Sequence, residues 1–400
     1  MQLGSEKDVD GIHRNISMGV NLPLVDGKLA LRVSGNSEHE RYQMVNMHTG
    51  VQGNADRGFI RSQLLWQVDD ETSVTFGYSR TAFDRIGSQE GDRSLPGYYW
   101  DYKLTNNDEA KYGYDVEFNK VPCSETAERP ECNAGNGPVV ARNVPKKYQT
   151  WNLMDPRENI TNDLFTLNIQ DDNLFDLATV SYAGSIRTRE RDNVQTAWSR
   201  LDASDMFKTW ILDHSKYDRV THQIRFQNLD TKSPLSWTVG AYYDKTEYDA
   251  DPIYQNQYHE KGDEVSALML NWWGADATQI GLDTFNNPQN NWNYTLVYDF
   301  EKELAFFADV AYEFDLGDMG SLELNGGVRR FELKDGSHSK QSGIWATTDN
   351  ELGGEESGNR YKMSASYRPS DDMSVYALYS EGYRPGGNNG PLAASCADDP

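Results

Sequence analysis

The sequence has 400 residues, 37% of them hydrophobic, and its 38 lysines and arginines against 62 aspartates and glutamates give a formal net charge of -24. This acidity argues against a nucleic-acid partner, because binding to phosphates is driven by basic side chains. The aromatic content of 12% argues against disorder, and no apolar run approaches 18 residues, which excludes a transmembrane helix.

Several segments alternate apolar and polar residues with the period of two that is typical of β-strands. The clearest alternations are 16–22, 29–33, 74–78, 235–243, 304–314, 322–329, 361–368 and 373–380. Weaker alternations run near 58–68, 163–170, 176–186 and 220–228. Together they predict about twelve strands.

The connections between these strands alternate between short and long. The short ones are rich in Asp, Gly, Asn and Pro, as tight turns require, and lie at 25–27, 69–71, 171–173, 230–234, 316–320 and 369–372. The long ones run near 37–57, 84–159, 188–219, 249–300, 335–357 and from 384 onward. A chain that threads up and down through a membrane produces this pattern, with short turns at the periplasmic rim and long loops outside.

The pattern therefore predicts an all-β fold, an antiparallel transmembrane β-barrel. Its apolar face would meet lipid, and its polar face would line a wet lumen. Residues expected on the polar face are Arg32, Glu323, Arg329, Lys362 and Arg368. The alternative is a soluble β-sandwich or propeller, whose polar face would meet bulk water.

Aromatic residues lie close to the ends of many predicted strands. Such residues form girdles at membrane interfaces, although aromatic side chains favour strands in any case. They are Trp66, Tyr78, Tyr182, Tyr243, Tyr312, Phe314, Tyr367, Tyr379 and Tyr383.

Three stretches carry a resemblance to a known family. They are GVNLPLVDGKLALRVSG at 19–35, FADVAYEFDLGDMGSLELNGGVRRFE at 307–332, and YRPSDDMSVYALYSEGYRPGGNN at 367–389. The last contains the run YSEGYRPGG, which closely matches the strand-to-loop signature of TonB-dependent outer-membrane receptors. The chain as a whole resembles the barrel domain of that family.

The resemblance implies a barrel of 22 strands that encloses a plug domain. Residues 1–400 would supply a partial barrel, about the second to the thirteenth strand, with Met1 to Gly4 as the end of the first. On this expectation, residues 1–400 do not include the plug domain or the C-terminal strands of the barrel. The N-terminus lacks the basic start and apolar core of a signal peptide, so we expect the chain to be a fragment of a longer protein.

The function that the resemblance implies is import of a scarce nutrient, an iron–siderophore complex, across the outer membrane of a Gram-negative bacterium. The expected partners are outer-membrane lipid, the siderophore, and the TonB inner-membrane complex, which would act through the plug. The alternatives are a passive porin-like or structural barrel, and a receptor for a glycan or vitamin. The sequence contains no enzyme signature, and no cofactor is expected.

Ligand contacts are expected from aromatic and polar residues of the long loops. Aromatic pairs offer large contact areas to organic ligands, and an arginine would pair with an anionic one. These aromatic residues would otherwise pack the loops against each other, and the arginine would pair with a loop acid. The candidates are Tyr98, Tyr99, Trp100, Trp272, Trp273 and Arg384.

The three cysteines are Cys123, Cys132 and Cys396. Cys123 and Cys132 share one loop-like stretch, which favours a disulfide in an oxidising compartment over two unpaired thiols. The partner of Cys396 would lie beyond residue 400. No CxxC pair occurs and the histidines are scattered, so no metal site is predicted.

Overall fold

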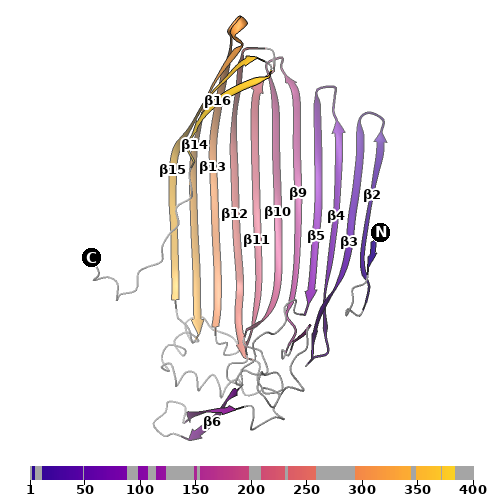
Figure 1. The fold of residues 1–400 in the computed structure, drawn as a ribbon, viewed down its shortest axis with the longest axis vertical. Helices are drawn as coiled ribbons and strands as arrows, with labels where there is room; N and C mark the ends of the chain where they lie inside the picture. The colour runs from indigo at the N-terminus through magenta and orange to yellow at the C-terminus, as the bar shows by residue number, and fades with distance from the viewer. Residues whose placement is uncertain are drawn as a thin grey trace, which may run out of the picture.

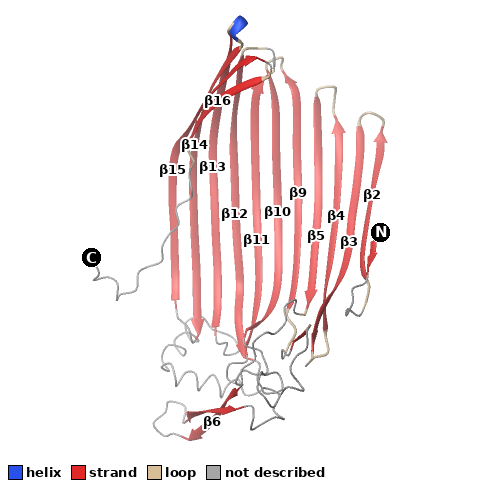
Figure 2. Cartoon of the chain, viewed as in Figure 1, coloured by secondary structure: helices blue, strands red, loops and turns tan. Residues whose placement is uncertain are grey.

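The computed structural model describes residues 2–4, 11–47, 49–87, 98–106, 114–122, 148–150, 154–197, 209–229, 233–257, 293–343, 348–370 and 372–382. Most of these residues lie in β-strands, and the helical element among them is the short 3₁₀ helix η4 (Gly317–Met319) (Figure 2). Within the described ranges no helix has the length and apolarity needed to span a membrane.

The main sheet has 14 strands. Its long strands lie side by side in the order in which they occur in the sequence (Figure 1). Thirteen of the 14 strands follow the order β1-β2-β3-β4-β5-β9-β10-β11-β12-β13-β14-β15-β16, and the fourteenth, β8, pairs with β3 beside this path. The first strands are β1 (Gln2–Gly4), β2 (His13–Val25), β3 (Leu29–Asn46), β4 (Gln52–Gln67), β5 (Thr72–Ile86) and β9 (Arg157–Leu174). The others are β10 (Ala178–Ala197), β11 (Thr209–Asn228), β12 (Leu235–Gln257), β13 (Asn293–Asp315), β14 (Ser321–Gly343), β15 (Thr348–Ser370) and β16 (Met373–Ser380).

All pairings along this path are antiparallel, which confirms the predicted class of sheet. The register of β13 against β14 is continuous from Asn293 opposite Gly343 to Asp315 opposite Ser321. At 23 residues each, these two strands extend for roughly 75 Å. That is more than twice the length of the roughly 9–11 residues that a tilted strand needs to cross a membrane.

One face of the sheet is apolar and exposed, whereas a soluble domain would bury it. A single cross-strand row on this face runs through Leu22, Leu31, Leu64, Phe76, Leu167, Gly184, His222, Tyr243 and Leu304. Phe165, Ile186 and Phe306 in adjacent rows are each more than half exposed. We call this surface the apolar face, and the opposite one the polar face.

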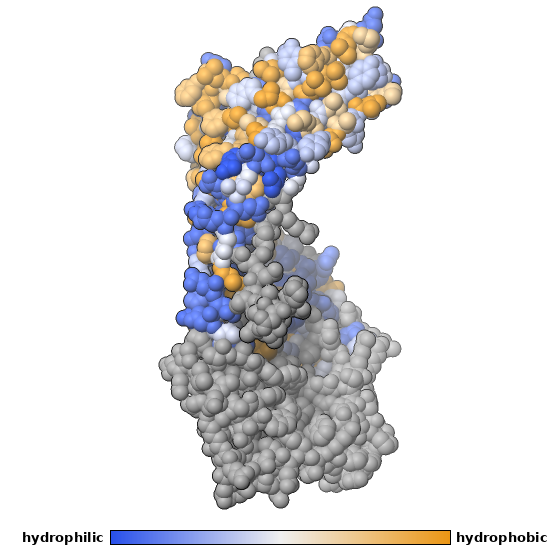
Figure 3. Space-filling view, turned by 90° about the vertical axis from the view of Figure 1, so that its left-hand side faces the viewer, coloured by the Kyte–Doolittle hydropathy of each residue, from blue (hydrophilic) through white to orange (hydrophobic). Residues whose placement is uncertain are grey.

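The apolar residues gather at the end of the sheet that carries the short turns. Figure 3 shows this end mostly in orange and white, and the next stretch of the strands in blue. On β13 the apolar side of the strand runs from Leu304 to Phe314, and Lys302 is the first charged residue beyond it. The strands therefore continue, fully paired, well past the apolar band.

This continuation corrects two of the predicted long loops. Most of 37–57 belongs to β3 and β4, and most of 335–357 belongs to β14 and β15. The prediction was wrong because it read strands from apolar alternation. That signal ends where the apolar band ends, although backbone pairing between polar residues continues.

The strand number also exceeds the prediction of about twelve. The short strand β1 at Gln2–Gly4 pairs with β2, as expected for that remnant. The additional strands lie in the region predicted as one very long loop. They are β8 (Gln149–Thr150), which pairs in parallel with β3, and the separate hairpin of β6 (Tyr98–Asn106) and β7 (Tyr114–Pro122).

The predicted short turns at 25–27, 69–71 and 316–320 are confirmed, whereas residues 171–173 belong to β9 and the turn follows at 175–177. Local hydrogen bonds build these turns. In the β4–β5 turn, the Asp69 carboxylate accepts from the backbone N–H groups of Glu71 (3.0 Å) and Thr72 (2.8 Å). These hydrogen bonds lower the pKa of Asp69. In the β13–β14 turn, the Gly320 N–H donates to the Gly317 carbonyl.

We predict that Gly320→Ala destabilises the protein by about 2 kcal/mol, because φ of +86° at Gly320 is accessible almost only to glycine. A Cβ built there would also overlap the backbone carbonyl oxygen of Arg368. The matched control is Gly317→Ala, where φ is +60° and nothing lies within 4 Å of a built Cβ, so we expect about 1 kcal/mol. Urea unfolding of the detergent-solubilised proteins measures both, and an equal loss in the two variants would contradict the assignment.

Candidate functional site

The polar face carries a chain of arginine–carboxylate contacts that crosses from β3 to β14. The side chains that make it come from alternate positions of the strands, as a period of two requires. On β3 and β4, Arg57 Nη1 donates to Glu40 Oε2 at 2.7 Å and to Glu38 Oε1 at 3.1 Å. Both contacts join a guanidinium to a carboxylate, the pairing with the strongest hydrogen bonds of this kind.

The densest part of this chain lies at the end of the sheet opposite the short turns. Glu158 accepts from Arg85 Nη2 at 2.9 Å and from Arg191 Nε at 2.8 Å. Arg191 Nη1 also contacts Asp213 Oδ2 at 3.0 Å. The Glu158 and Asp213 side chains are each only 13% exposed, so solvent screens this network less than it screens a surface ion pair.

Two further arginines are held farther along the same face. Asp244 Oδ2 accepts from Arg219 Nε and Thr221 Oγ1, both at 2.8 Å. Glu303 accepts from Arg329 Nη2 at 2.6 Å, and the Arg329 guanidinium lies 5.3 Å from the centre of the Tyr242 ring. These contacts satisfy the charges and fix the arginine planes against the wall.

Three arginines of β10 lie in a row along the strand on this face, and we call them the arginine column. Arg187, Arg189 and Arg191 occupy alternate positions, so all three side chains project to one side. Arg187 donates through Nε to Asn162 Oδ1 at 2.5 Å and lies 5.7 Å from the centre of the Tyr217 ring. Arg189 makes no hydrogen bond or ion pair to any residue that the structure describes. Arg187 and Arg189 therefore present cationic charge that no described carboxylate neutralises.

This arrangement can bind an anion. Guanidinium groups offer planar, paired donors to carboxylates and to other oxyanions, and Tyr217 adds an aromatic surface beside them. For the described residues, no cluster of three or more His, Cys, Asp or Glu side chains has the geometry to hold a metal ion. Because its side chains are cations, the column fits an anionic solute better than a bare cation.

The structure describes three of the six loop residues predicted to contact ligand, and these three are not part of the main sheet. Tyr98, Tyr99 and Trp100 begin β6, in the hairpin that is separate from the main sheet. The other predicted positions lie outside the described residues, and they are Trp272, Trp273, Arg384, Cys123, Cys132 and Cys396.

Sequence reasoning missed the arginine column, although the signal was present. The run Arg187-Thr188-Arg189-Glu190-Arg191 alternates cations with other residues. It lay in the stretch predicted as the loop 188–219, where a period of two was not sought. Once β10 is known to continue to Ala197, the alternation places the three arginines on one face.

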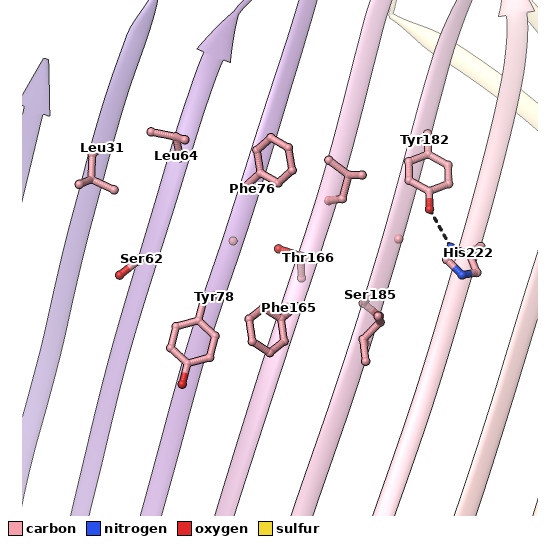
Figure 4. Close-up of a pocket in the computed structure, with 14 residues that line it drawn as sticks. Leu31, Ser62, Leu64, Phe76, Tyr78, Phe165, Thr166, Tyr182, Ser185 and His222 are labelled. Atoms are coloured by element: carbon pink, nitrogen blue, oxygen red, sulfur yellow. Dashed lines mark hydrogen bonds between the residues drawn. The ribbon is translucent and has the colours of Figure 1, made fainter. Parts of the chain in front are cut away.

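A shallow depression of about 450 Å³ on the apolar face is a different kind of feature (Figure 4). Its lining includes Leu31, Leu64, Phe76 and Phe165 from four neighbouring strands. At its edge Tyr182 Oη lies 2.7 Å from His222 Nδ1, a hydrogen bond that satisfies a polar ring within the apolar row. The depression has few polar groups, so it does not suit a hydrophilic solute.

No protein-family model and no curated protein matches the chain. Among solved structures it is similar to the ferric yersiniabactin uptake receptor FyuA from Yersinia pestis, with 15% identity, a TM-score of 0.57, and coverage of 96% of this chain and 46% of that one. It is also similar to the ferric-catecholate import receptor Fiu from E. coli K12 in its open form (12%, 0.52, 96% and 56%). A third is the ferripyoverdine receptor of the outer membrane of Pseudomonas aeruginosa (14%, 0.51, 93% and 41%).

These likenesses confirm the expected resemblance at the level of the fold. The chain has the strand architecture of outer-membrane receptor barrels, and it spans about half the length of the solved structures that it matches.

We predict that Glu158→Ala lowers the free energy of unfolding by roughly 2 kcal/mol, because it leaves Arg85 and Arg191 without their shared carboxylate. The control is Glu355→Ala, which breaks the exposed pair with Lys334 and should change stability by less than about 0.5 kcal/mol. Urea midpoints in detergent report both values. A loss at Glu355 as large as that at Glu158 would show that the network is no stronger than a surface pair.

Proposed function

We propose that the protein is an outer-membrane receptor of a Gram-negative bacterium that imports an anionic iron–siderophore complex, with energy from the TonB system. The observation that carries this proposal is the arginine column of β10, on the polar face of a sheet with the receptor-barrel fold. We assign the apolar face to lipid and the polar face to the lumen. TonB would act through a plug domain, as the family resemblance implies.

The two faces support the membrane part of the proposal. Large side chains such as Phe306 and Ile186 are more than half exposed on the apolar face, which a chain in water would avoid over so wide an area. Backbone groups in hydrocarbon must be paired within the protein, and the continuous antiparallel registers of the long strands provide that pairing.

The arginines support the ligand part. The chain carries a net charge of -24, and Arg187 and Arg189 are neighbouring cations of the polar face for which the structure describes no carboxylate partner. A ferric complex with carboxylate or catecholate donors carries negative charge at its surface, and Arg187 and Arg189 would pair with it. The receptors with which the fold is shared are named for ferric yersiniabactin, ferric catecholates and ferripyoverdine, which is consistent with this ligand class.

Two other functions use the same wall. A passive porin-like or structural barrel would conduct ions in a planar bilayer, whereas a plugged receptor stays closed. A receptor for a neutral glycan or vitamin would not depend on the arginine column.

We expect Arg187→Gln combined with Arg189→Gln to weaken binding of the ferric siderophore by at least about tenfold, since each lost charge-assisted contact is worth about 1.5 kcal/mol or more. The experiment complements a deletion of the gene in the source organism and measures growth and ⁵⁵Fe–siderophore uptake on iron-poor medium. Growth should be slow with the variant and normal with the wild type.

The matched control is Lys216→Gln, which removes a cation of β11 on the opposite face, where Lys216 pairs with Asp218. Uptake should be unchanged in this variant. Normal uptake by the double arginine variant would contradict the proposal. Normal growth of the deletion strain on the iron-poor medium would contradict it as well.

A further inference from the structure

A cross-strand row on the polar face leads away from the arginine column. Arg189 of β10 lies directly opposite Tyr217 of β11, which lies opposite Tyr248 of β12, and Tyr248 lies opposite Asp299 of β13. Each of these residues is five positions from its own strand's member of the apolar row. An odd separation places a side chain on the opposite face, so all four side chains share the polar face. We call them the Arg–Tyr–Tyr–Asp row.

The two ends of this row carry opposite charges. At one end are Arg187 and Arg189, at alternate positions of β10. At the other end Asp299 and Glu301 occupy alternate positions of β13, and Asp335 of β14 lies directly opposite Glu301. Three strand spacings separate β10 from β13, which amounts to roughly 14 Å. The wall therefore presents cations and carboxylates to the same solvent at a defined separation.

The carboxylates at the β13 end lack the cation that other acids of this face have. Glu303, farther along β13, accepts from Arg329 Nη2. Neither Asp299 nor Glu301 has a cationic partner among the residues that the structure describes, and Oδ1 of Asp299 is buried without a hydrogen bond. A buried carboxylate oxygen without a donor is costly, so the missing donor points to a ligand.

An organic cation fits this end of the row better than a lysine of the wall or a metal ion. Lys302 and Lys334 lie an odd number of residues from Asp299 and Asp335, so they project from the other face. In the described part of the chain, no cluster of carboxylates and histidines has the geometry to hold a metal ion. An ammonium group, by contrast, offers three donors to such carboxylates.

The two tyrosines provide the surface between the charged ends. Tyr217 and Tyr248 are directly opposed across β11 and β12, so their rings are neighbours on the polar face. The Arg187 guanidinium lies 5.7 Å from the centre of the Tyr217 ring, which joins the aromatic surface to the arginine column. Planar or aromatic parts of a ligand would pack against this surface.

We propose that the Arg–Tyr–Tyr–Asp row selects a zwitterionic ferric complex. The anionic iron-binding end would lie at the arginine column, an ammonium group would donate to Asp299, and the segment between them would lie over the tyrosines. Asp299 is then a specificity-determining residue, because an anionic complex without the ammonium group would bind through the arginines alone. This inference rests on the proposed function and narrows its ligand class.

The test uses the full-length gene product in detergent and two synthetic probes. One is a ferric tris-catecholate whose linker ends in a primary ammonium group, and the other is its N-acetyl derivative, which lacks that charge. The wild type should bind the ammonium probe on the order of tenfold more tightly, the factor expected for one hydrogen bond between charged groups. Asp299→Asn should bind both probes with the affinity that the wild type has for the N-acetyl probe.

The matched control is Asp249→Asn, which removes an exposed carboxylate from the opposite face of the neighbouring strand β12. This variant should keep the tenfold preference for the ammonium probe. Equal affinity of the wild type for the two probes would overturn the inference. An unchanged preference in Asp299→Asn, or a loss of the preference in Asp249→Asn as well, would also overturn it.

The arginines give a separate readout for the proposed function. Arg187→Gln combined with Arg189→Gln should weaken binding of both probes by the same factor, because both probes carry the anionic ferric centre. Wild-type affinity of this variant for both probes, or failure of the wild type to bind either probe, would overturn the proposed function. A loss confined to the ammonium preference overturns the inference alone, so the two failures are distinguishable.

Discussion

Backbone pairing between neighbouring strands is the constraint on which this structure depends. In hydrocarbon each N–H and C=O must find its partner within the protein, and ten antiparallel interfaces along the path meet this demand with long registers. Because the backbone is satisfied by its neighbours, the side chains of the two faces are free to serve opposite solvents. Phe306 is exposed on one face, while Phe331 and Leu333 of the other lie in a small core with Ala305.

The same pairing extends beyond the apolar band, and there the chemistry changes. Ion pairs between strands replace apolar contacts on the outer side, as in the pair of Lys334 and Glu355. On the polar face, Glu158 holds two arginines together at the loop end of the sheet. The paired strands therefore carry charged side chains beyond the apolar band, to the end of the sheet opposite the short turns.

The apolar alternation predicted the strands within the band and the short turns, because both depend on local sequence. It stopped at Lys302 and Lys245, where the strands continue but the apolar side of each strand ends. The arginine column was missed for this reason, since Arg187 and Arg189 lie where polar residues occupy both faces of β10. The β6–β7 hairpin was missed as well, because it lies within a stretch whose turn-rich composition predicted a loop. The contact of Arg191 with Asp213, 22 residues away, depends on register that composition does not encode.

The central claim is that one face of the sheet meets lipid and the other meets water. Single cysteines placed in turn from Leu304 to Val310, with the native cysteines replaced by serine, would carry spin labels in reconstituted bilayers. Accessibility to oxygen and to a water-soluble nickel chelate should alternate with a period of two, with Phe306 and Ala308 in lipid and Phe307 and Asp309 in water. Equal accessibility to the chelate at all positions would contradict the account.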